Sequence, residues 1–302
     1  MTGYSRRDFL SYSLAAGAGL GLLPRFAAAQ DATAPGADMR FGLVTYQWGR
    51  DWDLPTLLAN CEKAQVPGVE LRTTHAHGVE PTLSANAREE VKKRFADSPV
   101  ALVGLGSNER FDQPERIELV KAIQATKEFL QLSHDVGGSG VKVKPNDFHE
   151  GVPREKTIEQ IGKALHMLGQ FGANLGQEVR LEVHGQCSEL PTIKAIMEAA
   201  DHANVGVCWN SNDTDLEGEG LEHNFDLVKK YFGDTAHVRE LNIGDYPYQQ
   251  LMNLFAGMNY GGWILLEART APEDRVKALI EQREVFHEMV ANAQAEVTAA
   301  TG

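Results

Sequence analysis

The chain of 302 residues is 42% hydrophobic and 24% charged, which is a composition typical of globular proteins. Its formal net charge is −13. Because a nucleic-acid partner requires a basic surface, this charge argues against binding to DNA or RNA. The three cysteines, Cys61, Cys187 and Cys208, lack metal-site spacing. Cys187 and Cys208 form a disulfide in an oxidising compartment if they lie close together, but buried free thiols are the expectation.

Residues 1–29 are predicted to be a twin-arginine export signal. Arg6-Arg7 precedes an Ala/Gly-rich apolar run at residues 13–23, and three alanines at 27–29 offer a cleavage site. The run is too short for stable membrane insertion. Removal of this segment, whose three Arg and one Asp carry +2, changes the charge from −13 to −15. We therefore expect a short tail at residues 30–39 and a periplasmic mature protein. A chance arginine pair is the alternative.

From residue 41 onward, short apolar runs alternate with segments of helical period. The strands are predicted at residues 41–46, 68–72, 100–105, 140–144, 179–183, 205–209, 237–243 and 263–267, and the helices at 53–65, 84–97, 113–134, 154–175, 190–203, 221–232, 248–256 and 272–293. Such alternation implies parallel strands. Eight units over roughly 250 residues predict a single-domain α/β (β/α)8 TIM barrel at residues 40–295. A doubly wound open sheet is the alternative, although no glycine-rich phosphate turn follows the first strand.

Polar residues gather where the predicted strands end, and the active site of a TIM barrel lies at that end. The fifth strand delivers Glu182 and His184, which project to one face because they are two residues apart. The next three strands carry Asn210 with Asp213, His237 with Glu240, and Glu267 with Arg269. This mixture of carboxylate and imidazole ligands suits Mn²⁺, Zn²⁺, Co²⁺ or Mg²⁺. An ion pair at the strand end or a solvated edge is the alternative for Glu182.

Four segments give the chain a family resemblance: Leu181-Glu182-Val183-His184-Gly185, Cys208-Trp209-Asn210, His237-Val238-Arg239-Glu240 and Leu266-Glu267. Through them, residues 41–293 resemble the xylose isomerase-like barrels, and within these the sugar phosphate isomerase/epimerase-type proteins that include ketose 3-epimerases. The resemblance implies that the metal is held by Glu182, Asn210, His237 and Glu267. Asn210 stands where that family usually has Asp. Asp213 stands where it often has a substrate-binding His, and Asp213 is therefore the other candidate ligand.

The resemblance also implies an activity, namely isomerisation or epimerisation of a keto-sugar through an enediolate, with Glu182 and Glu267 as the acid/base pair. Pure ligation by both glutamates, with His184 or His75 as the base, is the alternative. His75, His184, Asp213 and Trp48 are the predicted substrate contacts, and Trp48 either stacks on a sugar or packs at the barrel mouth. The acidic charge and the expected export favour an unphosphorylated sugar. A 3-keto-glycoside lyase and a non-catalytic carbohydrate-binding barrel are the other hypotheses, and a homodimer is a reasonable expectation.

Overall fold

The structure is a computed structural model that describes residue 36 and residues 38–301. The predicted export signal and most of the predicted tail lie outside the described residues. These residues form eight strands: β1 (Arg40–Val44), β2 (Gly68–Arg72), β3 (Ala101–Arg110), β4 (Gly140–Lys144), β5 (Glu178–Glu182), β6 (Val205–Asn210), β7 (Phe232–Val238) and β8 (Trp263–Leu266). They also form eight α-helices: α1 (Leu54–Ala64), α2 (Ala85–Ala96), α3 (Arg116–Val136), α4 (Arg154–Ala173), α5 (Leu190–Ala200), α6 (Leu221–Val228), α7 (Tyr248–Gly257) and α8 (Arg275–Thr301), with two 3₁₀ turns, η1 (Asp213–Leu216) and η2 (Lys229–Tyr231).

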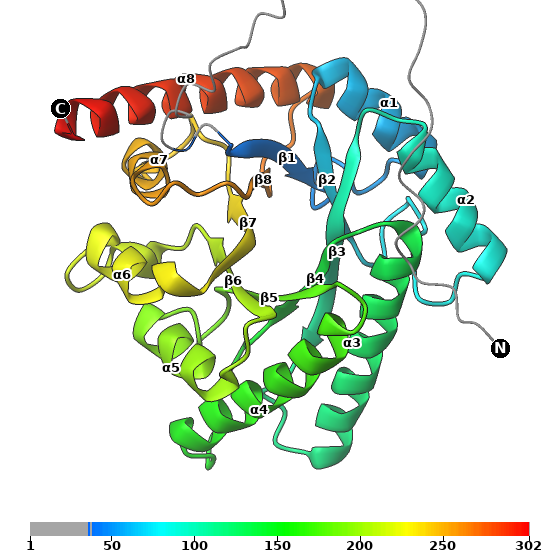
Figure 1. Cartoon of the computed structure of the whole chain (residues 1–302), viewed down its shortest axis with the longest axis vertical. Helices are drawn as coiled ribbons and strands as arrows, with labels where there is room; N and C mark the ends of the chain where they lie inside the picture. Colours follow the sequence, from blue (N-terminus) through cyan, green and yellow to red (C-terminus); the bar gives the residue numbers. More distant parts are fainter. Residues whose placement is uncertain (1–35, 37, 302) are drawn as a thin grey trace, which may run out of the picture. The chain divides into compact units, whose positions relative to one another are not determined.

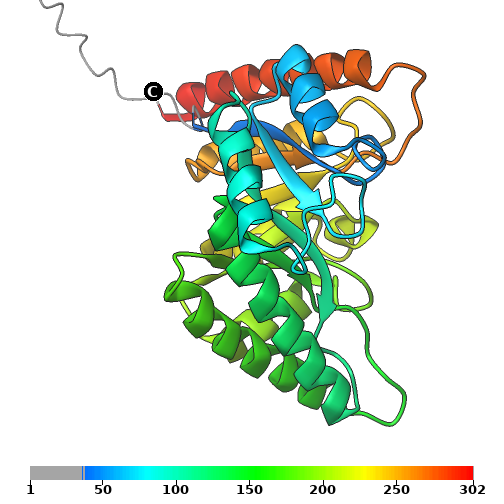
Figure 2. The ribbon, with the colours of Figure 1, turned by 90° about the vertical axis from the view of Figure 1, so that its right-hand side faces the viewer.

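The strands form one closed parallel barrel in sequence order, and the helices surround it (Figures 1 and 2). Closure is made by β1 and β8, where Phe41 is level with Ile264 and Leu43 with Leu266. The predicted (β/α)8 barrel is therefore confirmed, and an open doubly wound sheet is excluded because it leaves its edge strands unpaired. Within the described residues, no helix is both long and apolar enough to cross a membrane.

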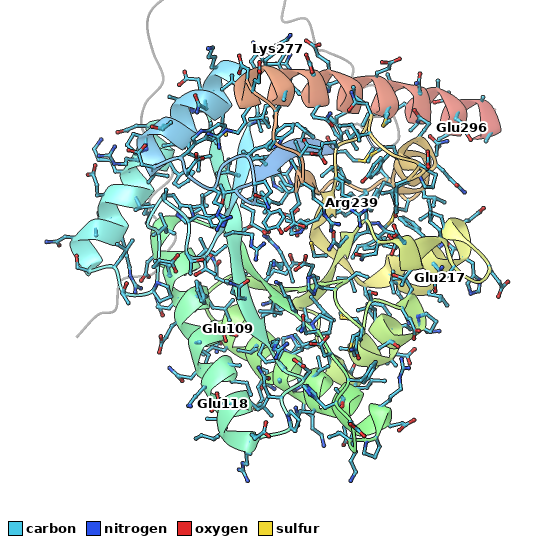
Figure 3. All side chains as sticks on the ribbon, turned by 180° about the vertical axis from the view of Figure 1, so that it is seen from behind. Glu109, Glu118, Glu217, Arg239, Lys277 and Glu296 are labelled. Carbon is cyan, nitrogen blue, oxygen red and sulfur yellow. The ribbon has the colours of Figure 1, made fainter. Side chains whose placement is uncertain are left out.

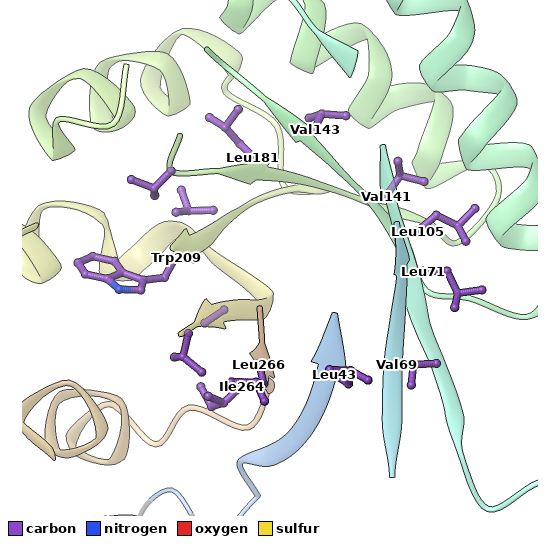
Figure 4. Packing of buried hydrophobic residues seen from close by; sticks show 14 of the residues in the cluster. Leu43, Val69, Leu71, Leu105, Val141, Val143, Leu181, Trp209, Ile264 and Leu266 are labelled. Atoms are coloured by element: carbon purple, nitrogen blue, oxygen red, sulfur yellow. The ribbon is translucent and has the colours of Figure 1, made fainter. Parts of the chain in front are cut away.

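Alternation along the strands separates the apolar packing from the polar interior. Figure 4 shows outward side chains such as Leu71 of β2, Val143 of β4 and Trp209 of β6, which belong to one large apolar cluster. Since successive side chains of a strand point to opposite faces, the residues between them point into the barrel. Glu70 of β2 and Lys142 of β4 occupy such inward positions and are fully buried. The polar interior is therefore a direct consequence of the two-residue period.

Toward the amino ends of the strands, the barrel interior is filled by an ion network around Arg180 of β5. Its guanidinium donates to Glu178 at 2.8 Å, to the Val103 carbonyl at 3.1 Å and to Ser139 Oγ at 2.7 Å. A Cβ at Gly104 would lie 2.7 Å from this guanidinium, so the glycine leaves room for it. Because every Arg180 nitrogen donates a hydrogen bond, its burial is compensated within the fold.

The position predicted for the seventh strand was wrong. The structure places β7 at Phe232–Val238 instead of residues 237–243, and α6 ends at Val228 instead of residue 232. Gly233 and Asp234 interrupt the apolar run that marks a strand in the sequence, although Asp234 is fixed there by a hydrogen bond from its N–H to Glu178. His237 consequently stands at the carboxyl end of β7, which is the end where active sites form.

The three cysteines are buried free thiols, as expected. Burial raises the pKa of Cys61 to about 12 and, together with the charge of Asp112, that of Cys187 to about 12. Thiols that do not ionise at neutral pH are poor nucleophiles and poor metal ligands.

Candidate metal centre

Three side chains from three strands converge at the carboxyl end of the barrel. Glu182 ends β5, His237 lies near the end of β7, and Glu267 directly follows β8. Their ligand atoms all lie within 4.8 Å of one another, and all three residues are buried. Parallel pairing makes this possible, because it sets Glu182 level with Cys208 and Asn210 level with His237. The structure therefore brings together three of the four predicted metal ligands.

The two carboxylate oxygens of Glu182 face different partners. Oε2 lies 2.7 Å from the ammonium nitrogen of Lys142, and Oε1 lies 3.8 Å from Nδ1 of His237. Burial raises the pKa of Glu182, but the charge of Lys142 and the contact with His237 outweigh it and hold the pKa well below its usual value. Glu182 can therefore form the ion pair and bind a metal at the same time, because Oε2 faces Lys142 and Oε1 faces the cluster.

His237 lies between two buried carboxylates. Its Nε2 is 3.3 Å from Oε1 of Glu70, on the side opposite the Nδ1 contact with Glu182. Among the described residues, neither ring nitrogen of His237 and neither oxygen of Glu70 makes a hydrogen bond of good geometry. A carboxylate behind the distal nitrogen is typical of metal-ligating histidines, whose tautomer and orientation it fixes.

Asn210 completes the four predicted ligands. Its Nδ2 donates a 3.1 Å hydrogen bond to Oε1 of Glu182, so the amide nitrogen rather than the oxygen faces the cluster. A half-turn of the amide about its last bond exchanges these two atoms. Ligation by Asn210 therefore requires that half-turn, and it remains a prediction.

Glu267 and Arg72 form the outer side of the cluster. Nη1 of Arg72 lies 3.8 Å from Oε1 of Glu267, and Nη2 donates to Oδ1 of Asn108 at 2.9 Å. Burial and the negative charge of Glu182 raise the pKa of Glu267, against the opposing charges of His237, Lys142 and Arg72. A buried carboxylate that is only partly compensated is what a cation would stabilise.

The cluster fits a divalent cation. It offers one oxygen from each of two carboxylates and an imidazole nitrogen with no hydrogen-bond partner among the described residues. Ligands about 2.0–2.3 Å from one ion lie within roughly 4–4.6 Å of one another, which is close to the observed spread. Carboxylate and imidazole donors suit zinc, manganese, cobalt or magnesium. These residues can therefore hold such an ion after small side-chain movements.

Two histidines follow β2, and one of them, His77, is structural. The ring of His77 is buried, its Nε2 donates to the Arg72 carbonyl at 2.7 Å, and its Nδ1 accepts from the N–H of Val79 at 3.0 Å. His75 is only half-buried, with Nδ1 3.3 Å from Oγ1 of Thr45. Burial and the nearby Arg72 lower the pKa of His75 to about 4, so it is neutral at pH 7. His75 therefore keeps a surface that a substrate can reach.

His184 is held by the loop that follows β4. Its Nδ1 donates to Oδ1 of Asn146 at 3.1 Å, which leaves Nε2 as an acceptor. Gly185 makes the local path possible, because its φ is +71° and a Cβ there would lie 2.4 Å from the Asn146 carbonyl. Such a conformation and such a close approach both require glycine. The two loops thus fix the imidazole predicted to contact substrate.

Trp48 and Asp213 lie outside the cluster. The Trp48 indole is buried and donates to the Thr270 carbonyl at 3.0 Å, which matches the packed alternative. The side chain of Asp213 is 95% exposed on η1, with Oδ1 4.0 Å from Nη1 of Arg239. The structure therefore does not bring Asp213 to the other ligands. Substrate contact by either residue remains a prediction.

Three charged residues of the centre were not among the predicted site residues: Glu70, Arg72 and Lys142. All three stand on β2 or β4, and Glu70 and Lys142 alternate with the outward-facing Val69, Leu71, Val141 and Val143. This alternation is a signal that identifies inward positions from sequence. Glu240 was also noted at a strand end, and its Oε1 accepts three hydrogen bonds from Arg269 and Thr270, so it joins the β7 and β8 loops.

Comparison with known proteins assigns the family. Residues 58–289 match the family model described as xylose isomerase-like TIM barrel, so the chain belongs to this family. Similar solved structures include a 3-keto-D-glucoside 4-epimerase from E. coli (15% identity, 83% of this chain and 99% of that one, TM-score 0.71). An L-ribulose 3-epimerase (14%, 87% and 98%, 0.75) and a zinc-bound IOLI protein (14%, 84% and 99%, 0.71) are also similar. No curated protein sequence matches.

Proposed function

We propose that this protein is a divalent-metal-dependent isomerase or epimerase that abstracts a proton next to the ketone of an unphosphorylated sugar. The observation that carries the proposal is the buried cluster of Glu182, His237 and Glu267, whose ligand atoms lie within 4.8 Å of one another. Its placement at the carboxyl end of a closed barrel, in a chain of the xylose isomerase-like family, supports the same activity.

The residues of the centre divide the chemistry between them. Glu182, His237 and Glu267, with Asn210, would hold a cation that supplies Lewis-acid polarisation of the ketone and its neighbouring hydroxyl. One glutamate removes the proton from the carbon between those oxygens, and the other returns a proton on the opposite face. Lys142 and Arg72 place positive charge beside the two glutamates. This charge lowers the free energy of a negatively charged enediolate.

The substrate is proposed to lack phosphate because of the charge of the chain. The expected mature chain carries −15 (−13 less the +2 of the export signal), which repels phosphorylated sugars. Export to the periplasm by the twin-arginine route is part of the proposal, and it would place the enzyme where sugar phosphates are scarce. A signal-peptide fusion that carries Arg6→Lys and Arg7→Lys and still reaches the periplasm would contradict that part.

A 3-keto-glycoside lyase is the second candidate. The same proton abstraction next to a 3-keto group, followed by loss of the substituent at C1, is a β-elimination that requires no further catalytic residue. The fold shared with a 3-keto-D-glucoside 4-epimerase makes this class worth testing. A non-catalytic carbohydrate-binding barrel is the third candidate, because Asn210 supplies one negative charge fewer than Asp.

The proposal is tested by exchange of a sugar C–H for deuterium in heavy water, over a panel of free and 3-keto sugars and four metals. We expect exchange that chelation abolishes and that Glu182→Gln reduces by at least about a hundredfold. Metal-free protein that still catalyses exchange would contradict the proposal. Release of the C1 substituent favours the lyase, and sugar binding without exchange favours the binding barrel.

A further inference from the structure

A cavity that is separate from the metal cluster lies between the loops that follow β6 and β7, at the carboxyl end of the barrel. It has a volume of about 260 Å³ and is lined by Asp213 and Leu216 of η1 and by Arg239, Ile243, Tyr246 and Tyr248 after β7, among others. None of these residues belongs to the metal cluster. The cavity therefore provides a surface that proton abstraction does not use.

Two residues that line the cavity are close in sequence to predicted metal ligands. Arg239 is two residues after His237, and Asp213 is three residues after Asn210. Because a residue spans at most about 3.6 Å, these Cα atoms are no more than about 7 Å and about 11 Å apart. Figure 3, which views the barrel from the side opposite to Figure 1, places Arg239 toward the middle of the molecule and Glu217 near its rim. The loops that line the cavity therefore start from the strand ends that carry Asn210 and His237.

The walls of the cavity are held by partly buried hydrogen bonds. The Tyr246 hydroxyl donates to Oδ2 of Asp215 at 2.6 Å and accepts from Nε1 of Trp209 at 3.3 Å. The Tyr248 hydroxyl accepts from the N–H of Arg239 at 2.9 Å, and the two tyrosine rings lie 4.7 Å apart. These contacts join both loops to the strand ends, so the cavity is a built part of the fold.

Two features of the lining indicate what the cavity binds. Leu216 is 40% and Ile243 is 55% exposed, and they are two of the five exposed large hydrophobic residues in the described part of the chain. Nε of Arg239 is buried and has no hydrogen-bond partner within residues 38–301. An exposed apolar pair beside an unsatisfied donor suits a ring that presents both a hydrophobic face and an oxygen acceptor.

Charge excludes an anionic ligand. Asp213 and Asp245 both line the cavity, against the single positive charge of Arg239. A phosphate or carboxylate would meet a net negative lining, in a chain that is itself acidic. The guanidinium of Arg239, whose Nε has no hydrogen-bond partner among residues 38–301, would in turn repel a cationic ring, so we take the ring to be uncharged.

We propose that this cavity is a second subsite that binds an uncharged, oxygen-bearing ring joined to the reacting sugar, so that the substrate is a glycoside rather than a free monosaccharide. This subsite rests on the proposed function, because it requires a sugar bound at the metal. It adds the class of substrate, namely a glycoside. The ring is either a second sugar or an aromatic alcohol, which share the apolar face and the oxygen acceptor.

The test is a binding measurement that needs no turnover. Zinc-loaded full chain is titrated calorimetrically with glucose, with maltose and cellobiose, and with both anomers of p-nitrophenyl glucoside. Each titration is repeated for Ile243→Ser, for Arg239→Gln, and for the control Ile117→Ser, which changes a similarly exposed isoleucine of α3. The measured quantity is the affinity for each glycoside relative to glucose.

We expect at least one glycoside to bind at least about tenfold more tightly than glucose, and Ile243→Ser and Arg239→Gln each to remove most of that preference while Ile117→Ser preserves it. Preference for the disaccharides identifies a sugar ring, and preference for the nitrophenyl glucosides an aryl ring. Equal binding of glucose and all glycosides, or a preference that both cavity variants retain, would overturn the subsite. If the protein prefers glycosides to glucose but catalyses no deuterium exchange, the proposed activity is overturned and the subsite is not.

Discussion

Lys142 and Glu182 form an ion pair inside the barrel, with Nζ of the lysine 2.7 Å from Oε2 of the glutamate and both side chains inaccessible to solvent. The pair places a permanent positive charge next to the carboxylate that we assign to the metal. It compensates the charge at one oxygen of Glu182 and leaves the other for His237 and the cation. The centre is therefore partly neutralised before metal binds, which explains how three buried carboxylates share one end of the barrel.

Loss of that lysine should destabilise the protein. Lys142→Met leaves Glu182 buried without its partner, and breaking a buried pair in this way costs about 3–5 kcal/mol of unfolding free energy. Addition of zinc should recover part of the loss, because a cation replaces the missing charge. Urea denaturation with and without zinc measures both effects. Lys144→Met, on the same strand but only partly buried, is the control, and equal losses in the two variants would refute the role of Lys142.

Replacement of the carboxylate behind His237 should weaken metal binding. Glu70→Gln keeps the size of the side chain but removes the charge that faces Nε2 of His237 at 3.3 Å. Changes of this kind typically lower metal affinity about 10–100-fold. Competition with a fluorescent zinc chelator gives the dissociation constant. Glu109→Gln, at the end of β3, makes the same charge change away from the cluster and is the control. Zinc binding as tight as in the wild type in both variants would show that Glu70 does not support His237.

An acid at position 210 should strengthen the metal site and weaken the metal-free fold. Asn210→Asp exchanges the 3.1 Å hydrogen bond to Glu182 for a repulsion between two carboxylates, which a bound cation relieves. The gap in melting temperature between metal-loaded and metal-free protein should therefore widen relative to the wild type. Differential scanning calorimetry measures the gap. A gap that stays the same would mean that residue 210 does not reach the ion.

His75 should make the fold sensitive to acid. Its pKa is lowered to about 4 by burial and by Arg72, whereas in the unfolded chain it is near 6.5. Between those values the unfolded chain binds a proton that the folded chain does not, so the contribution of His75 to stability falls as the pH drops from 6.5 to 4. His75→Gln should flatten the pH dependence of unfolding free energy in that window. An unchanged slope would show that the pKa of His75 is not depressed.

Much of the site follows from the sequence because parallel strands end together. The period-two pattern of β5 and β8 directs Glu182 and Glu267 into the barrel. His237, which the predicted seventh strand placed at its start, was grouped with them through the family resemblance, and the structure brings all three together. The same pattern in β2 and β4 also identifies Glu70 and Lys142, once one expects charges to be buried in pairs. Chain order alone thus brings residues about 200 positions apart to one end of the barrel.

Other features depend on contacts that no local pattern encodes. β7 begins at Phe232 because Asp234 is fixed by Glu178 of β5, a residue 56 positions away. The exposure of Asp213 follows from the start of η1, where Asn212 and Asp215 exchange capping hydrogen bonds. The pairing of Lys142 with Glu182 rather than Glu70 is set by distances inside the closed barrel. Such features require the three-dimensional fold.

We infer that Glu182, His237 and Glu267 together hold one divalent cation. The test is a measurement of bound metal by mass spectrometry. Purified wild type, His237→Gln and Glu267→Gln are first dialysed against equal concentrations of zinc and manganese. We expect one equivalent of metal in the wild type and less than about a tenth in each variant, with all three proteins folded by circular dichroism. Folded wild type without metal, or variants that retain a full equivalent, would contradict it.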